Sequence, residues 1–295
     1  MRSFLPLLAV GAFLALTGCD DVPGMNTGDS SASASESVSE TASETASEMA
    51  SESASESASS SSSIARVEFP YNPATQLASG SGQGYTDTSN WAPGICFPIA
   101  GLAYANSQVY RPGGSHYPTQ SATNHGSQCD SMNYAYPWSD NFCESRSWSN
   151  VMCKTGQGHQ GQDIRPATCK SNLHWAVAAE DGVITQVGSY TVALTGSGSP
   201  HRIYRYLHLQ SSSLKVAVGD EVKRGQKIGL VSNNLGTSNG VPQYTTIHLH
   251  FEVRIAQSET LSNGTVLTAN TFVPPYNALV DAYSRSLAGD CPVVE

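Results

Sequence analysis

Hydrophobic and polar positions alternate most clearly between residues 245 and 254. Apolar side chains occupy every second position from Ile247 to Val253, and polar ones fill the positions between them. Such alternation predicts a β-strand with one buried face. Because successive side chains point to opposite faces, His248 and His250 share the polar face, about 7 Å apart along the strand. For an isolated His-x-His pair, a solvated face and a functional pair are equally good interpretations.

Shorter runs with glycine-containing turns extend this pattern through the second half of the chain. We expect a hairpin of residues 175–179 and 182–187, and a C-terminal helix at about 276–287, between a Pro-Pro pair and a glycine. Further strands are predicted at residues 190–195, 202–207, 215–218, 227–231 and 247–255. Many short strands joined by turns favour a mainly β fold, an antiparallel β-sandwich.

The N-terminus has the features of an export signal. Arg2 precedes an apolar run, Phe4 to Leu16, which is too short to span a bilayer and is typical of a secretory signal peptide. The sequence Leu-Thr-Gly-Cys ending at Cys19 resembles a bacterial lipoprotein processing site. The resemblance implies a signal peptide at 1–19 and a lipid on Cys19, anchoring the protein to an inner or outer membrane of the bacterial cell envelope, facing the periplasm or the exterior. A plain signal peptide cut nearby is the alternative.

Residues 20–63 are of low complexity, with glutamate at every fourth position from Glu36 to Glu56 among serine, alanine and threonine. Without aromatic residues, and with almost no large aliphatic ones, this segment cannot bury enough surface to offset the entropy of ordering. We expect a disordered acidic tether. It holds nine acidic and no basic residues, so it accounts for the formal net charge of −9 and leaves residues 64–295 almost neutral. No basic patch suggests nucleic-acid binding.

The rest divides into an N-terminal extension (64–150), a strand-rich region (151–260) and a C-terminal segment (261–295). The extension is irregular and rich in Gly, Pro, Ser and Tyr, and its aromatic run at 133–143 either packs, which we favour, or lines a groove. An even number of cysteines in an exported chain predicts three disulfides, whose connectivity the sequence leaves open. We weakly favour Cys153 with Cys169. The six are Cys96, Cys129, Cys143, Cys153, Cys169 and Cys291.

A second group of candidate ligands lies in the Gly-containing loop 158–166. It offers His159 and Asp163, an imidazole and a carboxylate four residues apart. Together with one histidine of the strand they would supply three protein ligands. Three ligands and an open fourth position are typical of a catalytic zinc site.

The His-x3-Asp pair and the later His-x-His pair resemble the lysostaphin-type zinc metallopeptidases, which cut peptide bonds in bacterial peptidoglycan. The blocks at residues 179–184, 206–209 and 218–229 fit the family pattern in the family order. The resemblance covers about residues 156–254. It implies that residues 151–260 are the peptidase domain of a zinc-dependent endopeptidase acting on peptidoglycan stem peptides.

The resemblance also implies roles for individual residues. His159, Asp163 and His250 match the three zinc ligands. His248 matches a histidine that contacts the zinc-bound water, and His208 matches the other non-ligand histidine of the active site. Either could move a proton onto the leaving nitrogen near neutral pH, or donate a hydrogen bond to the oxyanion.

One departure from the family pattern and two alternatives accompany this interpretation. Residues 233–244 replace the family's short Gly-rich turn, so substrate preference cannot be transferred; we expect this loop to border the groove. The remaining histidines, at 116, 125, 174 and 201, match nothing in the family and are expected to be structural or solvated. The alternatives are an inactive relative that regulates another peptidoglycan hydrolase, and a non-haem iron site, since two His and one carboxylate also suit iron.

Overall fold

The computed structural model places the folded part of the chain in one compact unit, Ile64–Glu295. The predicted signal peptide, Cys19, the tether, His116 and His125 lie outside the described residues, and those expectations stay predictions. Within the described ranges, no helix has the length and apolar character needed to cross a bilayer. The structure describes residues 71–74, 77, 82–85, 88–101, 128–129 and 137–295.

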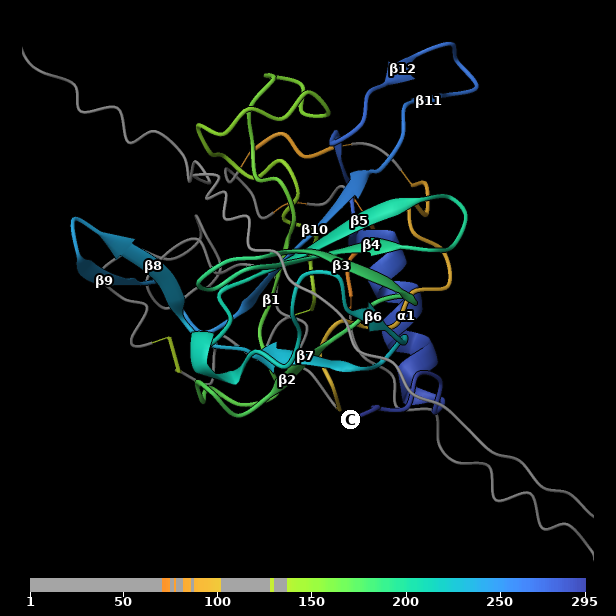
Figure 1. Cartoon of the computed structure of the whole chain (residues 1–295). Helices are drawn as coiled ribbons and strands as arrows, with labels where there is room; N and C mark the ends of the chain where they lie inside the picture. The colour runs from red at the N-terminus through yellow and green to blue at the C-terminus, as the bar shows by residue number, and fades with distance from the viewer. Residues whose placement is uncertain (1–70, 75–76, 78–81, 86–87, 102–127, 130–136) are drawn as a thin grey trace, which may run out of the picture. The chain divides into compact units, whose positions relative to one another are not determined.

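The fold is mainly β and its strand pairs are antiparallel, as predicted (Figure 1). The main sheet has seven strands, in the order β1-β10-β5-β4-β3-β6, with β13 also pairing with β10. Its strands are β1 (Gln162–Ile164), β3 (Gly182–Val187), β4 (Val192–Gly196), β5 (Arg202–Leu207), β6 (Glu221–Val222), β10 (Leu249–Ile255) and β13 (Phe272–Val273).

Strand β10 lies inside the main sheet, between β1 and β5. Leu249, Phe251 and Val253 on one of its faces are completely buried, so the predicted core face is confirmed. The opposite face carries the two histidines. Both faces of β10 are covered, and the side chains on its polar face therefore need partners within the protein.

Three two-stranded sheets complete the β-structure. They pair β2 (Trp175–Val177) with β7 (Lys227–Leu230), β8 (Asn234–Ser238) with β9 (Val241–Tyr244), and β11 (Glu259–Thr260) with β12 (Val266–Leu267). The β2–β7 pair forms a smaller second layer beside the main sheet (Figure 1). Tyr206 on β5 links the layers, since its hydroxyl accepts a hydrogen bond from the backbone N–H of Ala179 at 2.8 Å.

Two of the strand predictions are wrong: the expected hairpin has other pairing partners, and one expected strand is absent. Residues 175–179 and 182–187 do not form a hairpin, because β2 pairs with β7 whereas β3 pairs with β4 and β6. The intervening residues carry the chain from one layer to the other. Residues 215–218 do not form a strand. The N–H of Ala217 donates to the carboxylate of Asp220, and the next strand, β6, begins only after this turn.

The helix α1 (Tyr276–Leu287) has the predicted bounds. Its buried side includes Tyr276, Leu279 and Tyr283, at the spacing of one helical face. Tyr276 contacts Trp138 and Tyr283 contacts Phe97, with ring centroids 4.9 and 4.8 Å apart. Trp138 and Phe142, the aromatic residues of the run 133–143 that the structure describes, are buried and therefore pack, as favoured. The boundary at 150/151 stays a prediction, although one hydrophobic cluster continues across it.

Three disulfides are present, as the cysteine count predicted, but the favoured pair Cys153–Cys169 is wrong. A turn in which the N–H of Cys153 donates to the carbonyl of Asn150 brings Cys153 to Cys143 instead. Cys153 pairs with a cysteine 10 positions before it, and Cys169 pairs with one 40 positions before it. The position of the two cysteines on either side of the His159 loop was therefore a poor guide to their pairing. The bonds are Cys96–Cys291, Cys129–Cys169 and Cys143–Cys153.

Candidate metal centre

The register of the main sheet brings the loop 158–166 and the His-x-His strand together. Strands β1 and β10 are antiparallel neighbours, and Asp163 lies directly opposite His250. Side chains of directly opposed residues lie on the same face and within contact distance. His159 precedes β1, and Gly161 lets the loop approach β10 closely: a Cβ there would lie 2.5 Å from the carbonyl oxygen of Phe251.

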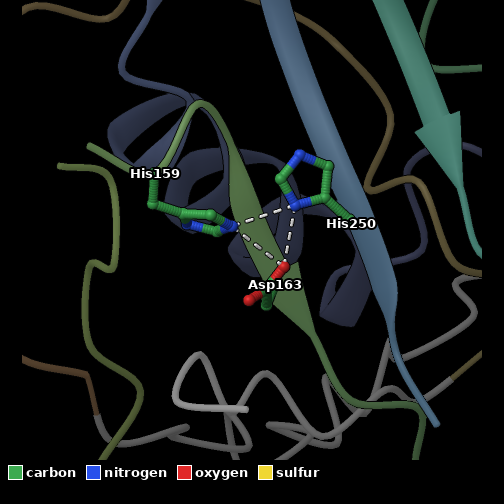
Figure 2. A group of neighbouring side chains, drawn as sticks. All are labelled: His159, Asp163 and His250. Carbon is green, nitrogen blue, oxygen red and sulfur yellow. Dashed lines mark hydrogen bonds and ion pairs between the residues drawn. The ribbon is translucent and has the colours of Figure 1, made fainter. Parts of the chain in front are cut away.

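Three potential ligand atoms converge at this point (Figure 2). Nε2 of His159 lies 3.0 Å from Nδ1 of His250 and 3.3 Å from Oδ1 of Asp163, and these last two atoms are 2.9 Å apart. All three residues are buried. Ligand atoms about 2.0–2.1 Å from a tetrahedral zinc ion are separated by about 3.3 Å. The spacing and donor types therefore fit a zinc ion with one further position open.

The far nitrogen of each imidazole also has a partner suited to metal binding. Nδ1 of His159 lies 2.9 Å from the backbone carbonyl oxygen of Asn141. Nε2 of His250 lies 3.2 Å from a carboxylate oxygen of Glu252. Such acceptors hold the proton on the far nitrogen and leave the near nitrogen free to bind metal. The donor set therefore passes a second test, because each histidine has an acceptor beside its far nitrogen that suits the tautomer needed for metal binding.

Burial and charge shape the ionisation of the three candidate ligands. Burial lowers the pKa of His159 to about 4. Burial alone would raise the pKa of Asp163, but the adjacent His159 and His248 hold it well below its usual value. For His250, the hydrogen bonds and charges of Asp163 and Glu252 outweigh burial and raise its pKa to about 9. The two carboxylates therefore favour the protonated imidazole in the metal-free protein, and a metal ion would compete with that proton.

Glu252 was not singled out from the sequence. Its carboxylate is buried, bonds Arg254 at 2.6 Å and lies 3.7 Å from Arg205. Burial would raise its pKa, but His250 and these two arginines lower it to about 2. The strand periodicity could have identified Glu252, since it follows His250 by two positions and so shares the polar face of β10.

His248 and His208 lie beside the cluster, not within it. Nδ1 of His248 lies 2.8 Å from the carbonyl oxygen of Thr246, while its Nε2 lies 3.5 Å from Oδ1 of Asp163. His208 follows β5, and its ring centroid is 4.5 Å from that of His248. Burial holds the pKa of His208 well below its usual value, so its imidazole is neutral. Both placements suit residues that act on a substrate, and these roles stay predictions.

The segment 233–244 forms the β8–β9 hairpin and contacts the site. The carbonyl oxygen of Asn234 lies 2.8 Å from Nδ1 of His208. Tyr190 stacks on the His208 ring at 6.1 Å. The hairpin exposes large apolar side chains, including Tyr244 and Val241. Its expected place beside a substrate groove stays a prediction.

The other described histidines do not join the site. His174 bonds the hydroxyl of Thr168, with its Nε2 2.6 Å from that oxygen. His201 is exposed and lies directly before β5. These positions agree with the expectation that both are structural or solvated.

Comparison with known protein families finds a match to the part of the chain that holds this site. Residues 157–264 match the model described as peptidase family M23. A comparison with curated protein sequences finds no match.

Several solved structures are similar to part of the chain. The LytM protein of Ruminococcus gnavus ATCC 29149 shows 22% identity and a TM-score of 0.34, over 44% of this chain and 48% of its own. The catalytic domain of the antimicrobial peptidase lysostaphin from Staphylococcus simulans shows 21% identity and a TM-score of 0.31, over 48% of this chain and 93% of its own. A zinc-containing peptidase from Vibrio cholerae shows 27% identity and a TM-score of 0.26, over 41% and 31%. The chain thus spans about half the length of the first and about a third of the last.

The match to the family model begins two residues before His159 and continues beyond His250, so it contains the whole cluster of Figure 2. On this evidence, the chain contains a peptidase family M23 domain.

Proposed function

We propose that this protein is a zinc-dependent endopeptidase that hydrolyses the peptide cross-links of bacterial peptidoglycan. The observation that carries the proposal is the convergence of His159, Asp163 and His250, with ligand atoms 2.9–3.3 Å apart, inside an M23 domain. A zinc ion held by these side chains would supply a Lewis acid for the scissile carbonyl and a nucleophile at neutral pH.

His248 has the geometry of a general base and acid. Its Nδ1 lies 2.8 Å from the Thr246 carbonyl oxygen, so its Nε2, 3.5 Å from Oδ1 of Asp163, would be the nitrogen that exchanges a proton beside the metal centre. In this position it can take a proton from the attacking water and deliver it to the leaving nitrogen. His208 is held neutral by burial and oriented by the Asn234 carbonyl, so it can assist the same transfer or position the substrate carbonyl.

Two alternatives receive less support. A regulator without activity would have no need for three converging ligands, their second partners and two additional histidines, and all of these are present. A non-haem iron site could use two histidines and a carboxylate as well. Metal analysis of the purified protein separates iron from zinc.

We also propose that the protein acts in the bacterial cell envelope, anchored by a lipid on Cys19. The processing-site sequence supports the anchor, and three disulfides suit an oxidising compartment outside the cytoplasm. The predicted tether of residues 20–63 would let the folded part reach away from the membrane, since a disordered segment of 44 residues averages roughly 35–40 Å end to end.

In the test, purified residues 20–295 are incubated with isolated peptidoglycan in the presence and in the absence of a chelator. Mass spectrometry of the products should reveal newly freed amino termini at cross-links, and the chelator should abolish them until zinc is restored. His250→Ala is the matched inactive control. Zinc binding without any new amino terminus, together with stimulation of a second hydrolase, would favour the regulator instead.

A further inference from the structure

Asn141 lies in the N-terminal extension, outside the matched peptidase residues, yet it contacts two of the candidate ligands. Its Nδ2 donates to Oδ2 of Asp163 at 3.0 Å, and its Oδ1 accepts from the backbone N–H of Asp163 at 3.2 Å. Its backbone carbonyl oxygen lies 2.9 Å from Nδ1 of His159. The Asn141 side chain is completely buried. One residue therefore contacts two candidate ligands, in each case on the side that faces away from the metal position.

Asn141 is itself held in place from several directions. Its backbone N–H donates to Oε1 of Gln162 at 3.2 Å, and Nε2 of Gln162 donates to the Ser139 carbonyl at 3.0 Å. The N–H of Glu144 closes a turn onto the Asn141 carbonyl at 3.1 Å. This network fixes the amide plane of Asn141 relative to β1.

The disulfide loop 143–153 extends the same support to His159. The N–H of Cys143 and Nδ2 of Asn150 both donate to the His159 carbonyl, and the N–H of His159 donates to the Glu144 carbonyl. Gly158 permits this contact, because a Cβ there would lie 2.8 Å from both Cα of Cys143 and Sγ of Cys153. The backbone on both sides of the first ligand thus rests on the extension.

We propose that Asn141 is a positioning residue for the metal centre. By binding Oδ2 of Asp163, the amide leaves Oδ1 directed at the two imidazoles, so the carboxylate offers one oxygen in a fixed orientation. The amide carries no charge and so does not repel a cation, as lysine or arginine in this place would. Such second partners typically change metal affinity 10- to 100-fold. The proposal rests only on the metal-binding part of the proposed function.

The test compares the wild type with Asn141→Leu, which keeps the branching and the number of side-chain heavy atoms but removes both hydrogen bonds to Asp163. Zinc affinity is measured by competition with a chromophoric chelator, and the coordination geometry by the absorption spectrum of the cobalt-substituted protein. Asn72→Leu is the matched control: Asn72 lies in the same extension and bonds the Ser139 hydroxyl, but no ligand. We expect the zinc dissociation constant to rise 10- to 100-fold in Asn141→Leu, with an altered cobalt spectrum, and neither change in Asn72→Leu.

A dissociation constant within about threefold of wild type in a folded Asn141→Leu protein would overturn the proposal. If that variant does not fold, Asn141→Ala, which leaves room for water, provides the same comparison. Loss of folding in both variants would also overturn it, because Asn141 would then serve the fold and not the metal centre. Absence of zinc binding by the wild type would instead contradict the proposed function, so the two failures are distinguishable.

Discussion

Replacing Glu252 by glutamine isolates the charge that supports His250. Glutamine has nearly the same shape and keeps an oxygen that can accept the hydrogen bond from Nε2 of His250, but it removes the negative charge. In the native protein this carboxylate is buried between His250, Arg254 and Arg205. After the substitution, the two arginines lose this anion. His250 keeps only Asp163 as its anionic partner, and a buried charge that loses a partner is costly.

The size of the effect follows from the pKa of Glu252. Burial opposes ionisation, but His250 and the two arginines outweigh it and lower the pKa from 4.5 to about 2. A difference of this size corresponds to roughly 3 kcal/mol of stability at neutral pH, as an upper estimate because glutamine keeps one hydrogen bond. Since the pKa is lower in the folded state, the contribution is present above pH 4.5 and is lost progressively as the pH falls towards 2.

The assay is urea unfolding of the metal-free wild type and Glu252→Gln at several pH values. We expect the variant to be less stable by about 3 kcal/mol at pH 7 and by about 1 kcal/mol at pH 3. Glu221→Gln, at an exposed position of β6, is the matched control and should change stability by less than about 0.5 kcal/mol. A loss below 1 kcal/mol at pH 7, or one that does not shrink towards low pH, would refute the reasoning.

Three further predictions concern other buried groups. His248→Ala should keep its zinc and lose about 10²- to 10⁴-fold in cleavage rate; metal loss, or a rate within threefold of wild type, would contradict its assigned role. Cys143→Ser opens the loop at His159 and should cost about 2–5 kcal/mol in urea unfolding, whereas an unchanged midpoint would speak against a structural disulfide. Burial outweighs the contact with Arg146 and raises the pKa of Glu144 to about 7. Folding therefore favours the protonated carboxyl, and the unfolding free energy of the wild type should fall relative to that of Glu144→Gln as the pH rises from 4.5 to 7. Urea unfolding of both proteins over this pH range measures the difference. An identical pH dependence of the two stabilities would contradict the prediction.

Local sequence determined the features that depend on near neighbours along the chain. The alternation around His248 and His250 identified a strand with a buried face at Leu249 and Phe251, because the period of two is a property of the extended backbone itself. The helix α1 was bounded correctly by prolines before it and a glycine after it. The number of disulfides followed from an even cysteine count in a chain with an export signal. Glu252 was accessible by the same periodicity and was overlooked.

Only the tertiary structure decided what depends on distant pairing. Cys153 joins Cys143 and not Cys169, and β2 pairs with β7 and not with β3, because loop closure and layer packing choose among partners that look alike locally. Candidate ligands His159 and His250 are 91 positions apart, and their common site was anticipated from a family resemblance, not from chain geometry. No sequence pattern indicated a role for Asn141. Its bond to Asp163 crosses 22 positions and exists only because the β1–β10 register and the disulfide loop place an amide beside a buried carboxylate.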